Sequence, residues 1–315
     1  MPAQDDFIER AAPFRAELIA HCYRMLGSVH DAEDLVQEAY LRGWRGYQAF
    51  EERAALRTWL YRIATTACLR ALENKARRVL PAGLGDGSVD PDIDPDGDGG
   101  CYHWLEPLPD AMTPEAVVTG RHTVRLAIAA ALQELPARQR AVLSLRDVAQ
   151  FSAAEVAELL ETTPAAVNSA LQRARAHLAD SAPSEEDVTE PDDNQRRELL
   201  DRYCAAFENA DLAALTALLQ TDVRLEMPPL AIWFAGRDAV TQFLARRAFA
   251  GPGDMVLVRT AANGEPAVAE YRRAGDGVLR AHSIHVLDTG RIGVAALTVF
   301  LDPGLFSVFG LPPTR

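Results

Sequence analysis

A helical stretch near the start of the chain carries side chains that could bind nucleic acid. Apolar residues at Leu56, Leu60, Ile63, Ala67 and Ala71 recur at helical spacing and predict a buried stripe from about Arg53 to Arg78. The opposite face carries cations for phosphates, rings for stacking and hydroxyls for base edges, which suits unstacked DNA. Its members are Arg57, Thr58, Trp59, Tyr61, Arg62, Thr65 and Thr66. A solvated Arg-rich face has the same composition, so composition alone leaves both interpretations open.

A second stretch has the pattern of a helix-turn-helix. The segments "SAAEVAELL" and "PAAVNSALQRARAHL" are separated only by "ETT", and Val167, Leu171, Ala174 and Leu178 share one face of the second helix. The opposite face would present polar side chains to the major groove of DNA. Purely structural helix pairs show the same pattern, so the motif needs support from elsewhere in the chain.

Composition limits the classes of protein to consider. The 315 residues are enough for two or three domains, and the net charge of -13 argues against a protein that coats DNA non-specifically. The four cysteines are scattered, which argues against a disulfide framework or a zinc site. No secretory signal or membrane-length apolar run is present in the sequence. We therefore expect a cytoplasmic protein with no membrane contact and no cofactor.

Two acidic segments divide the chain. The first 80 residues are predicted to be all helical, with one helix from Phe7 to Leu26 and a Ser28–Asp31 cap on the next. Residues 83–110 hold eight acids and 180–194 hold seven, and neither segment has a Lys or Arg. Both are interpreted as linkers. After Asp222, short β-rich runs separated by Gly, Asn and Asp predict an α+β domain.

The order of these motifs resembles that of a known family. "DAEDLVQEAYLRGWRGYQAF…LRTWLYRIATTACLRAL" resembles region 2 of the extracytoplasmic-function sigma factors, and "LPARQRAVLSLRDVAQFSAAEVAELLETTPAAVNSALQRARAHL" resembles their region 4. The resemblance covers roughly the first 180 residues. It implies binding of core RNA polymerase, of promoter -10 DNA and of promoter -35 DNA by three residue sets. The polymerase set is Asp31, Asp34, Leu35, Gln37 and Glu38; the -10 set is Arg53, Arg57, Thr58, Trp59, Tyr61, Arg62, Thr65 and Thr66; the -35 set is Pro164, Ala165, Ala166, Asn168, Ser169, Gln172, Arg173 and Arg175.

Some positions depart from the family pattern. Thr66 stands where Asn is usual and Arg70 where Asp is usual, and Asn168 and Ala170 stand where many relatives have Lys and Arg. The acidic helix start at Asp31 could equally be a solvated surface with acids near the positive end of the helix dipole. The six aspartates of Gly83–Gly100 could imitate RNA phosphates in the polymerase or form a solubilising spacer, with Trp104 docked on a protein surface.

The last third resembles the SnoaL-like members of the NTF2-like cone fold. That fold encloses an apolar pocket and occurs in isomerases, cyclases and binding domains. The fold alone therefore does not identify the function. The candidate pocket residues are Glu226, Met227, Trp233, Tyr271, His282 and His285. His282 and His285 are three apart in a predicted strand, so we expect them on opposite faces and no metal site. Asp211 and Asp222 read as caps, and the sequence offers no acid/base dyad, nucleophile constellation or phosphate loop.

The sequence thus predicts a multidomain chain with two all-α sigma modules and a C-terminal α+β NTF2-like cone domain. Its predicted parts are 1–80 (region 2), 81–112 (linker), 113–180 (region 4), 181–194 (linker) and 195–315 (SnoaL-like domain). We expect a non-enzymatic initiation factor whose C-terminal domain contacts the sigma modules and modulates them; the oligomeric state stays open. The alternatives are a helix-turn-helix regulator without polymerase, and a SnoaL-type enzyme or ligand sensor joined to a DNA-binding half.

Overall fold

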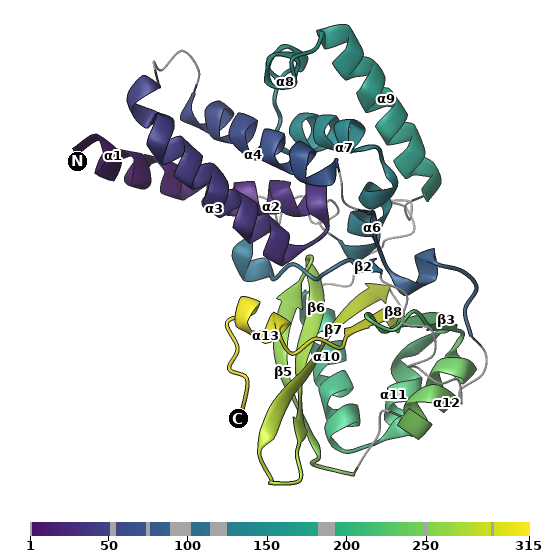
Figure 1. Cartoon of the computed structure of the whole chain (residues 1–315). Helices are drawn as coiled ribbons and strands as arrows, with labels where there is room; N and C mark the ends of the chain where they lie inside the picture. Colours follow the sequence, from purple (N-terminus) through teal and green to yellow (C-terminus); the bar gives the residue numbers. More distant parts are fainter. Residues whose placement is uncertain are drawn as a thin grey trace. The chain divides into compact units, whose positions relative to one another are not determined.

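The computed structural model describes residues 2–50, 55–73, 76–88, 102–113, 125–181, 193–247, 251–290 and 293–315. The chain forms two compact units (Figure 1). Unit 1 consists of Met1–Arg78 and Met112–Pro183, and unit 2 of Val79–Ala111 and Ser184–Arg315. The chain therefore passes from unit 1 into unit 2, returns to unit 1, and ends in unit 2.

Unit 1 is built from helices, and strand β1 (Arg78–Val79) begins at its last residue before the chain enters unit 2. Its elements are α1 (Pro2–Ala11), η1 (Ala12–Phe14), α2 (Arg15–Leu26), α3 (Val29–Gly46), η2 (Tyr47–Ala49), α4 (Leu56–Leu72), α6 (Leu126–Glu134), α7 (Ala137–Leu143), the π turn η6 (Ser144–Val148), α8 (Ala153–Leu159) and α9 (Pro164–Ser181). The prediction of one helix from Phe7 to Leu26 was wrong. Pro13 cannot donate a backbone hydrogen bond, and a single 3-10 turn separates α1 from α2 there.

The local signals in the sequence explain the starts and ends of these helices. Ser28 caps α3, with its Oγ accepting from the amide of Asp31 at 3.0 Å. Gly27 ends α2 in the left-handed region at φ 69°. Ser152 and Glu155 form a capping box at the start of α8. None of the described helices is both long enough and apolar enough to cross a membrane.

A buried arginine joins the two halves of unit 1. Arg140 on α7 donates to the carbonyls of Gln133 and Leu135 at 2.9 and 3.0 Å, and also to the carbonyl of Met25 at the end of α2. Burial lowers the pKa of Arg140 to about 10, so the group keeps its charge at neutral pH. Arg140 thereby links α6 and α7 to the end of α2 through hydrogen bonds to backbone carbonyls.

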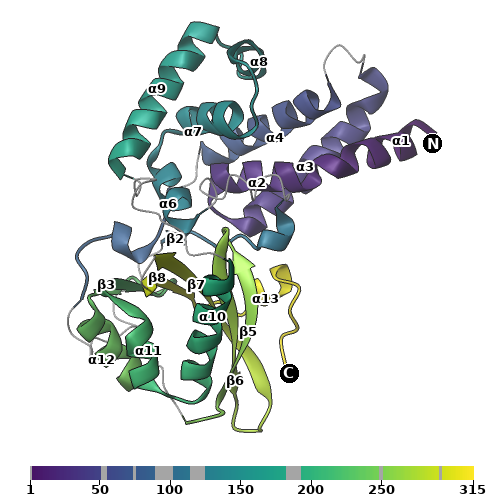
Figure 2. The ribbon, with the colours of Figure 1, turned by 180° about the vertical axis from the view of Figure 1, so that it is seen from behind.

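Unit 2 is an α+β fold around one sheet. Its helices are α10 (Asp193–Glu208), α11 (Leu212–Leu218), α12 (Arg237–Arg247) and α13 (Leu305–Val308), and its main strands are β3 (Leu219–Glu226), β4 (Trp233–Ala235), β5 (Met255–Ala262), β6 (Glu265–Arg273), β7 (Leu279–Gly290) and β8 (Gly293–Phe300). The strand order is β4-β3-β8-β7-β6-β5, antiparallel except for the parallel pair β3 and β8. The core lies between the sheet and α10, α11 and α12, and Figures 1 and 2 show α10 crossing one face of the sheet.

The described ends of the first acidic segment pack within unit 2. The stretch from Arg78 to Met112, which includes this segment, carries β1 (Arg78–Val79), η3 (Pro81–Gly83), β2 (His103–Trp104) and η4 (Asp110–Met112). Leu105 and Leu108 are fully buried. The amide of Leu108 donates to Oδ1 of Asn263 at 2.9 Å, and the amide of Asn263 returns a bond to the Leu108 carbonyl at 2.8 Å. Five of the six aspartates, at positions 90–98, lie outside the described residues, so their predicted role stays a hypothesis.

Candidate functional site

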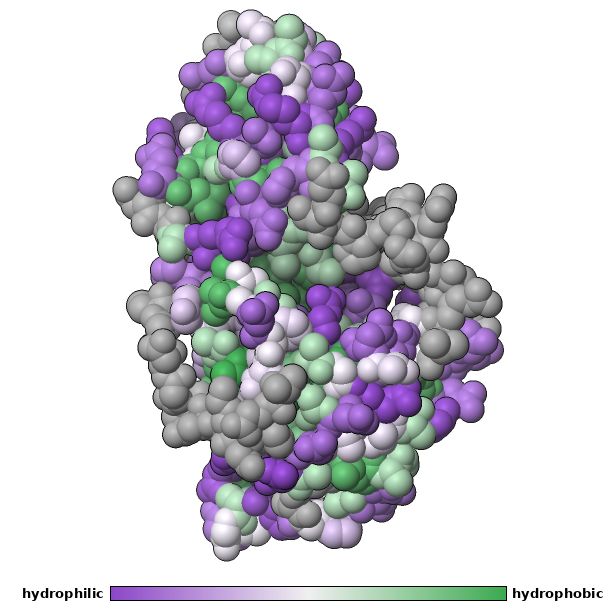
Figure 3. All heavy atoms as spheres, turned by 90° about the vertical axis from the view of Figure 1, so that its right-hand side faces the viewer, coloured by the Kyte–Doolittle hydropathy of each residue, from purple (hydrophilic) through white to green (hydrophobic). Residues whose placement is uncertain are grey.

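The outer face of α9 carries the predicted -35 residues. Val167, Leu171 and Ala174 are buried in unit 1. All eight predicted -35 residues are exposed, as helical periodicity requires for the opposite face. Figure 3 shows mostly hydrophilic residues at the top of the view, where α8 and α9 lie. The structure therefore brings this predicted set together on one accessible surface.

Short-range contacts orient the side chains of α9. The Thr163 hydroxyl accepts from the amide of Ala166 at 3.2 Å and caps the helix. Arg173 donates to Ser169 at 2.7 Å, one turn earlier on the same face. Arg175 forms a bidentate ion pair with Asp147, at 2.7 and 2.9 Å. Arg175 is thus directed toward η6, while Arg173 stays on the exposed face.

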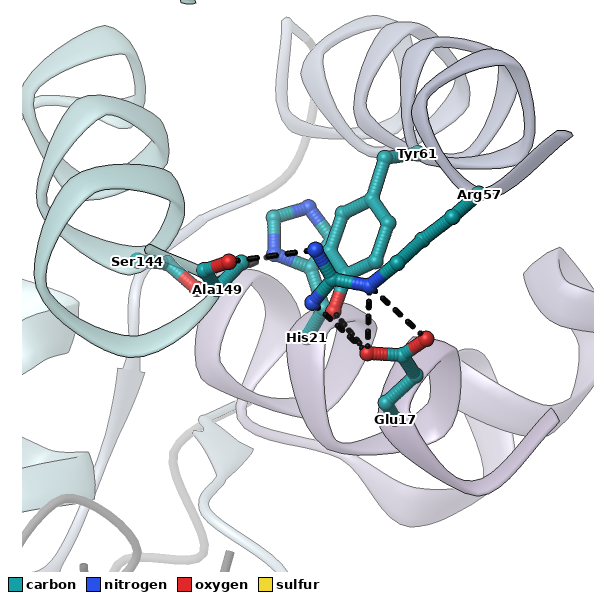
Figure 4. A network of polar contacts seen from close by, with 6 residues as sticks. All are labelled: Glu17, His21, Arg57, Tyr61, Ser144 and Ala149. Carbon is teal, nitrogen blue, oxygen red and sulfur yellow. Dashed lines mark hydrogen bonds and ion pairs between the residues drawn. The ribbon is translucent and has the colours of Figure 1, made fainter. Parts of the chain in front are cut away.

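On α4, the predicted -10 residue Arg57 lies in a network of polar contacts (Figure 4). Its guanidinium binds both carboxylate oxygens of Glu17 on α2, at 2.8 to 3.1 Å, and donates to the carbonyl of Ala149 at 3.2 Å. It also lies 4.9 Å from the ring centres of Tyr61 and Phe151. Two of these partners, Ala149 and Phe151, come from the region 4 half of the sequence.

Two other predicted -10 residues are buried beside this network. Tyr61 is 3% exposed and Thr65 fully buried. His21 lies between the modules, with Nε2 2.9 Å from the Thr65 hydroxyl and Nδ1 3.0 Å from the Ser144 hydroxyl. Burial, with Arg24 and Arg57 nearby, lowers the pKa of His21 to about 3, so its ring is neutral at physiological pH. In this conformation Tyr61 and Thr65 belong to the packing between the two halves of unit 1.

The remaining -10 residues are more open. Arg62 is exposed, and Thr58, Trp59 and Thr66 are half-buried. Trp59 stacks on Phe50 with ring centres 4.9 Å apart. Arg53 lies outside the described residues. The exposed part of this surface is therefore smaller than the sequence pattern implies.

The predicted polymerase-binding residues line the first turns of α3. Asp34 and Gln37 are exposed, and Asp31, Leu35 and Glu38 are half-buried. Asp31 pairs with Arg78 at 2.8 Å and Glu38 with Arg42 at 2.5 Å. Asp34 and Gln37 lie three residues apart and so share one face of the helix, available to a partner.

The candidate pocket residues divide into two groups. Met227, His282 and His285 line a cavity of about 250 Å³ in unit 2. The other three are not among the residues that line this cavity. Glu226 accepts from the amide of Ala82 and the Trp233 indole donates to the Gly85 carbonyl, each at 2.9 Å, so both hold the segment that follows unit 1. Tyr271 donates to the Pro312 carbonyl at 2.8 Å.

The expectation that His282 and His285 point to opposite faces was also wrong. Glu270 pairs with Ser283 and Tyr271 with Ala281, so His282 is an extra residue in a β-bulge. The bulge shifts the alternation of side chains, and both histidines line the cavity. No metal-binding cluster of His, Cys, Asp or Glu exists among the residues that the structure describes.

Sequence reasoning missed a buried carboxylate and histidine pair. Glu270 and His285 are each 2% exposed, and Oε2 of Glu270 lies 2.9 Å from Nε2 of His285. Burial alone would raise the pKa of the Glu270 carboxyl. The hydrogen bond from His285 and the charges of His285 and Arg272 outweigh burial and hold the pKa of Glu270 well below its usual range. A charged residue within the apolar run "PAVAEY" was the available signal for such a site.

Three family models match successive parts of the chain. Residues 12–78 match the family model for Sigma-70 region 2, residues 125–178 that for Sigma-70, region 4, and residues 200–295 that for the SnoaL-like domain. The helix-turn-helix, the helical bundle and the α+β unit each correspond to one of these matches.

Individual relatives match all or part of the chain. The chain is 48% identical over 316 residues to the ECF RNA polymerase sigma factor SigG of Mycobacterium tuberculosis, covering 98% of this chain and 84% of that protein. It is 30% identical over 179 residues to SigW of Bacillus subtilis, covering 56% of this chain and 88% of SigW. The crystal structure of the M. tuberculosis extracytoplasmic function sigma factor SigJ matches with a TM-score of 0.62 and 27% identity, covering 95% of this chain and 98% of that chain.

Proposed function

Since this chain belongs to the extracytoplasmic-function sigma factor family, we propose that α9 and α4 bind the -35 and -10 elements of one promoter while α3 binds core RNA polymerase. As a sigma factor the chain directs RNA polymerase to promoters for transcription initiation. We place this activity in the cytoplasm, where the polymerase and the chromosome are, and assign the chain no catalytic reaction of its own.

The single observation that carries the proposal is the exposed face of α9. Its apolar residues are buried, and the predicted -35 residues all face outward. Asn168, Ser169 and Gln172 can bond base edges in the major groove, and Arg173 can bind phosphate. Among the -35 residues, only Arg173 and Arg175 are basic, so few phosphates are neutralised and specificity depends on direct base contacts.

The face of α4 supports a gated role in binding the -10 element. Arg57 already has a carboxylate partner in Glu17, which occupies the guanidinium as a DNA phosphate would. Because Tyr61 and Thr65 are buried, they can reach DNA only after Ser144–Phe151 moves away from α4. We propose that binding to polymerase separates the two halves of unit 1 and uncovers this surface.

The acidic face of α3 suits a basic surface on the polymerase. Exposed Asp34 and Gln37, with Glu38 one turn along, supply acceptors, and half-buried Leu35 adds an apolar contact. Binding there leaves the faces of α4 and α9 for DNA. Unit 2 would modulate these steps, because the segment joining the two halves of unit 1 packs within it.

Run-off transcription with purified core enzyme tests the function. The full chain is mixed with core polymerase and a library of promoters, and transcripts are sequenced. We expect one -35 and -10 combination to be enriched, and Ser169→Ala with Gln172→Ala to change the -35 preference alone. Glu158→Ala, on exposed α8, is the matched control. Absence of any initiated transcript, or an unchanged -35 preference in the double variant, would contradict the proposal.

A further inference from the structure

The cavity in unit 2 has apolar walls and a charged end. Its volume is about 250 Å³. Phe207 of α10, Phe243 of α12 and Leu225 of β3 contribute to the walls, together with Leu297 and Val299 of β8. This volume lies just below the usual range of ligand pockets, roughly 300 to 1,000 Å³, so an occupant must be small.

The charged end is built by two neighbouring strands. Glu270 and Arg272 come from β6, and His282 and His285 from β7. Glu270 accepts from the Ser283 hydroxyl and from Nε of Arg272, both at 2.5 Å, and from Nε2 of His285 at 2.9 Å. The Tyr203 hydroxyl lies 2.9 Å from Nδ1 of His285. Both oxygens of Glu270 are therefore engaged, and the carboxylate serves to orient Arg272 and His285.

The charge of the lining favours an anion. Two guanidinium groups, Arg247 and Arg272, face one carboxylate, Glu270, so the lining is positive even with both histidines neutral. The Arg272 side chain is 38% exposed although its Nε is held by Glu270. Burial lowers the pKa of His282, which keeps that ring neutral and able to donate one hydrogen bond. Planar guanidinium groups match the two oxygens of a carboxylate.

We infer that this cavity binds a small monocarboxylic acid with an apolar body. Its carboxylate would contact Arg272, Arg247 and His282, and its apolar body would lie against Phe207, Phe243 and Leu297. A cation would be repelled by the two arginines. A neutral molecule of the same shape would bury the apolar walls but offer no negative charge to Arg272 or Arg247. The inference concerns unit 2 alone and does not depend on promoter recognition.

Isothermal titration calorimetry on the purified full chain, without polymerase or DNA, tests this inference. Octanoate is the probe, with 1-octanol as its neutral match and octylammonium as its cationic match. We expect octanoate to bind one per chain, at least about tenfold more tightly than octanol, since a hydrogen bond to a charged group contributes about 1.5 to 3 kcal/mol. Octylammonium should not bind.

Three substitutions locate the site. Arg272→Gln and Arg247→Gln should each weaken octanoate binding at least about fivefold and leave octanol binding unchanged. Arg246→Gln, the neighbouring position on α12, is the matched control and should bind octanoate like the natural chain. The Arg272 variant loses the bond to Glu270, which could destabilise unit 2. Arg247 is exposed on a helix, so the Arg247 variant tests the site independently of that loss. Equal binding of octanoate and octanol would overturn the inference, as would full octanoate affinity in the Arg247 variant.

Discussion

Arg57, which we propose binds the -10 element, is engaged in internal packing. Its guanidinium is bonded to Glu17 of α2 and to the Ala149 carbonyl of the other half of unit 1. Any DNA phosphate that takes Arg57 must replace these partners. The state seen here therefore stabilises the packed form at the expense of DNA affinity.

Replacing Glu17 should shift this competition. In Glu17→Gln the neutral amide holds Arg57 less tightly, and we expect single-stranded -10 DNA to bind the full chain about fivefold more tightly. That corresponds to about 1 kcal/mol, which is less than a buried charged hydrogen bond contributes, because both groups are partly exposed. Fluorescence anisotropy of a labelled oligonucleotide measures it. Glu9→Gln makes the same change at an exposed position, and equal affinities for the two variants would contradict the prediction.

His21 should make the stability of unit 1 depend on pH. Its pKa is about 3 in the folded protein and 6.5 when exposed, so between these values only the unfolded chain is protonated there. Because the unfolded state then binds more protons, stability is fully present above about pH 6.5 and falls as the pH drops, by about 1.4 kcal/mol per unit. Urea unfolding at pH 7 and 5.5, followed by circular dichroism, measures this slope. His21→Gln should reduce it, and an identical slope in both proteins would count against this origin.

At the scale of elements, the sequence predicted features set by neighbouring residues better than those set by residues distant in sequence. The buried and exposed faces of α9, the Ser28 cap and the Asp211 cap, which bonds the amide of Ala214 at 2.9 Å, are confirmed because they depend on residues within one turn. The burial of Thr65 was not predictable in this way. Its partner His21 lies 44 positions away in sequence, and His21 in turn bonds Ser144, 123 positions further along from it; only the packed fold brings these residues together.

The same limit applies to the strands of unit 2. The sequence predicted β-rich runs after Asp222, whereas the first strand of the sheet already begins at Leu219 and the helix α12 lies between β4 and β5. The bulge at His282 has no local sequence signal, and it decided which side chains share the cavity. A one-residue insertion reverses the facing of a strand, so sequence alternation fails there.

Salt dependence is a property of the α9 surface. Asn168 is exposed on the proposed DNA-binding face and carries no charge. In Asn168→Lys one additional phosphate contact should raise affinity for the -35 element and steepen the slope of log affinity against log salt by about 0.9. Binding titrations of polymerase holoenzyme at four salt concentrations measure the slope. His177→Lys adds a Lys near the other end of α9, beside Glu134, and should leave the slope unchanged. An unaltered slope for the Asn168 variant would place this face away from the phosphates.

At the scale of the whole molecule, removing residues 195–315 should affect the segment between the sigma modules. Leu105 and Leu108 are buried within unit 2, and the Leu108 amide bonds to Asn263. We expect the truncated protein to be cleaved faster by chymotrypsin within residues 79–111 and to change in transcription from the cognate promoter. Asn263→Ala, which removes one bond and keeps the domain, should increase cleavage less. Unchanged transcription by a folded truncated protein would refute a regulatory role for unit 2.

The path of the chain has one further consequence. Between Arg78 and Met112 the polypeptide is anchored in unit 2 on both sides of residues 89–101, by η3 at one end and by Leu105 and Leu108 at the other. These anchors therefore limit how far α4 and α9, the proposed -10 and -35 binding helices, can move apart. Releasing either anchor would lengthen the chain that links α4 to α9 and lower the effective concentration of each helix near the other. The protein would then tolerate a wider range of spacings between the two promoter elements.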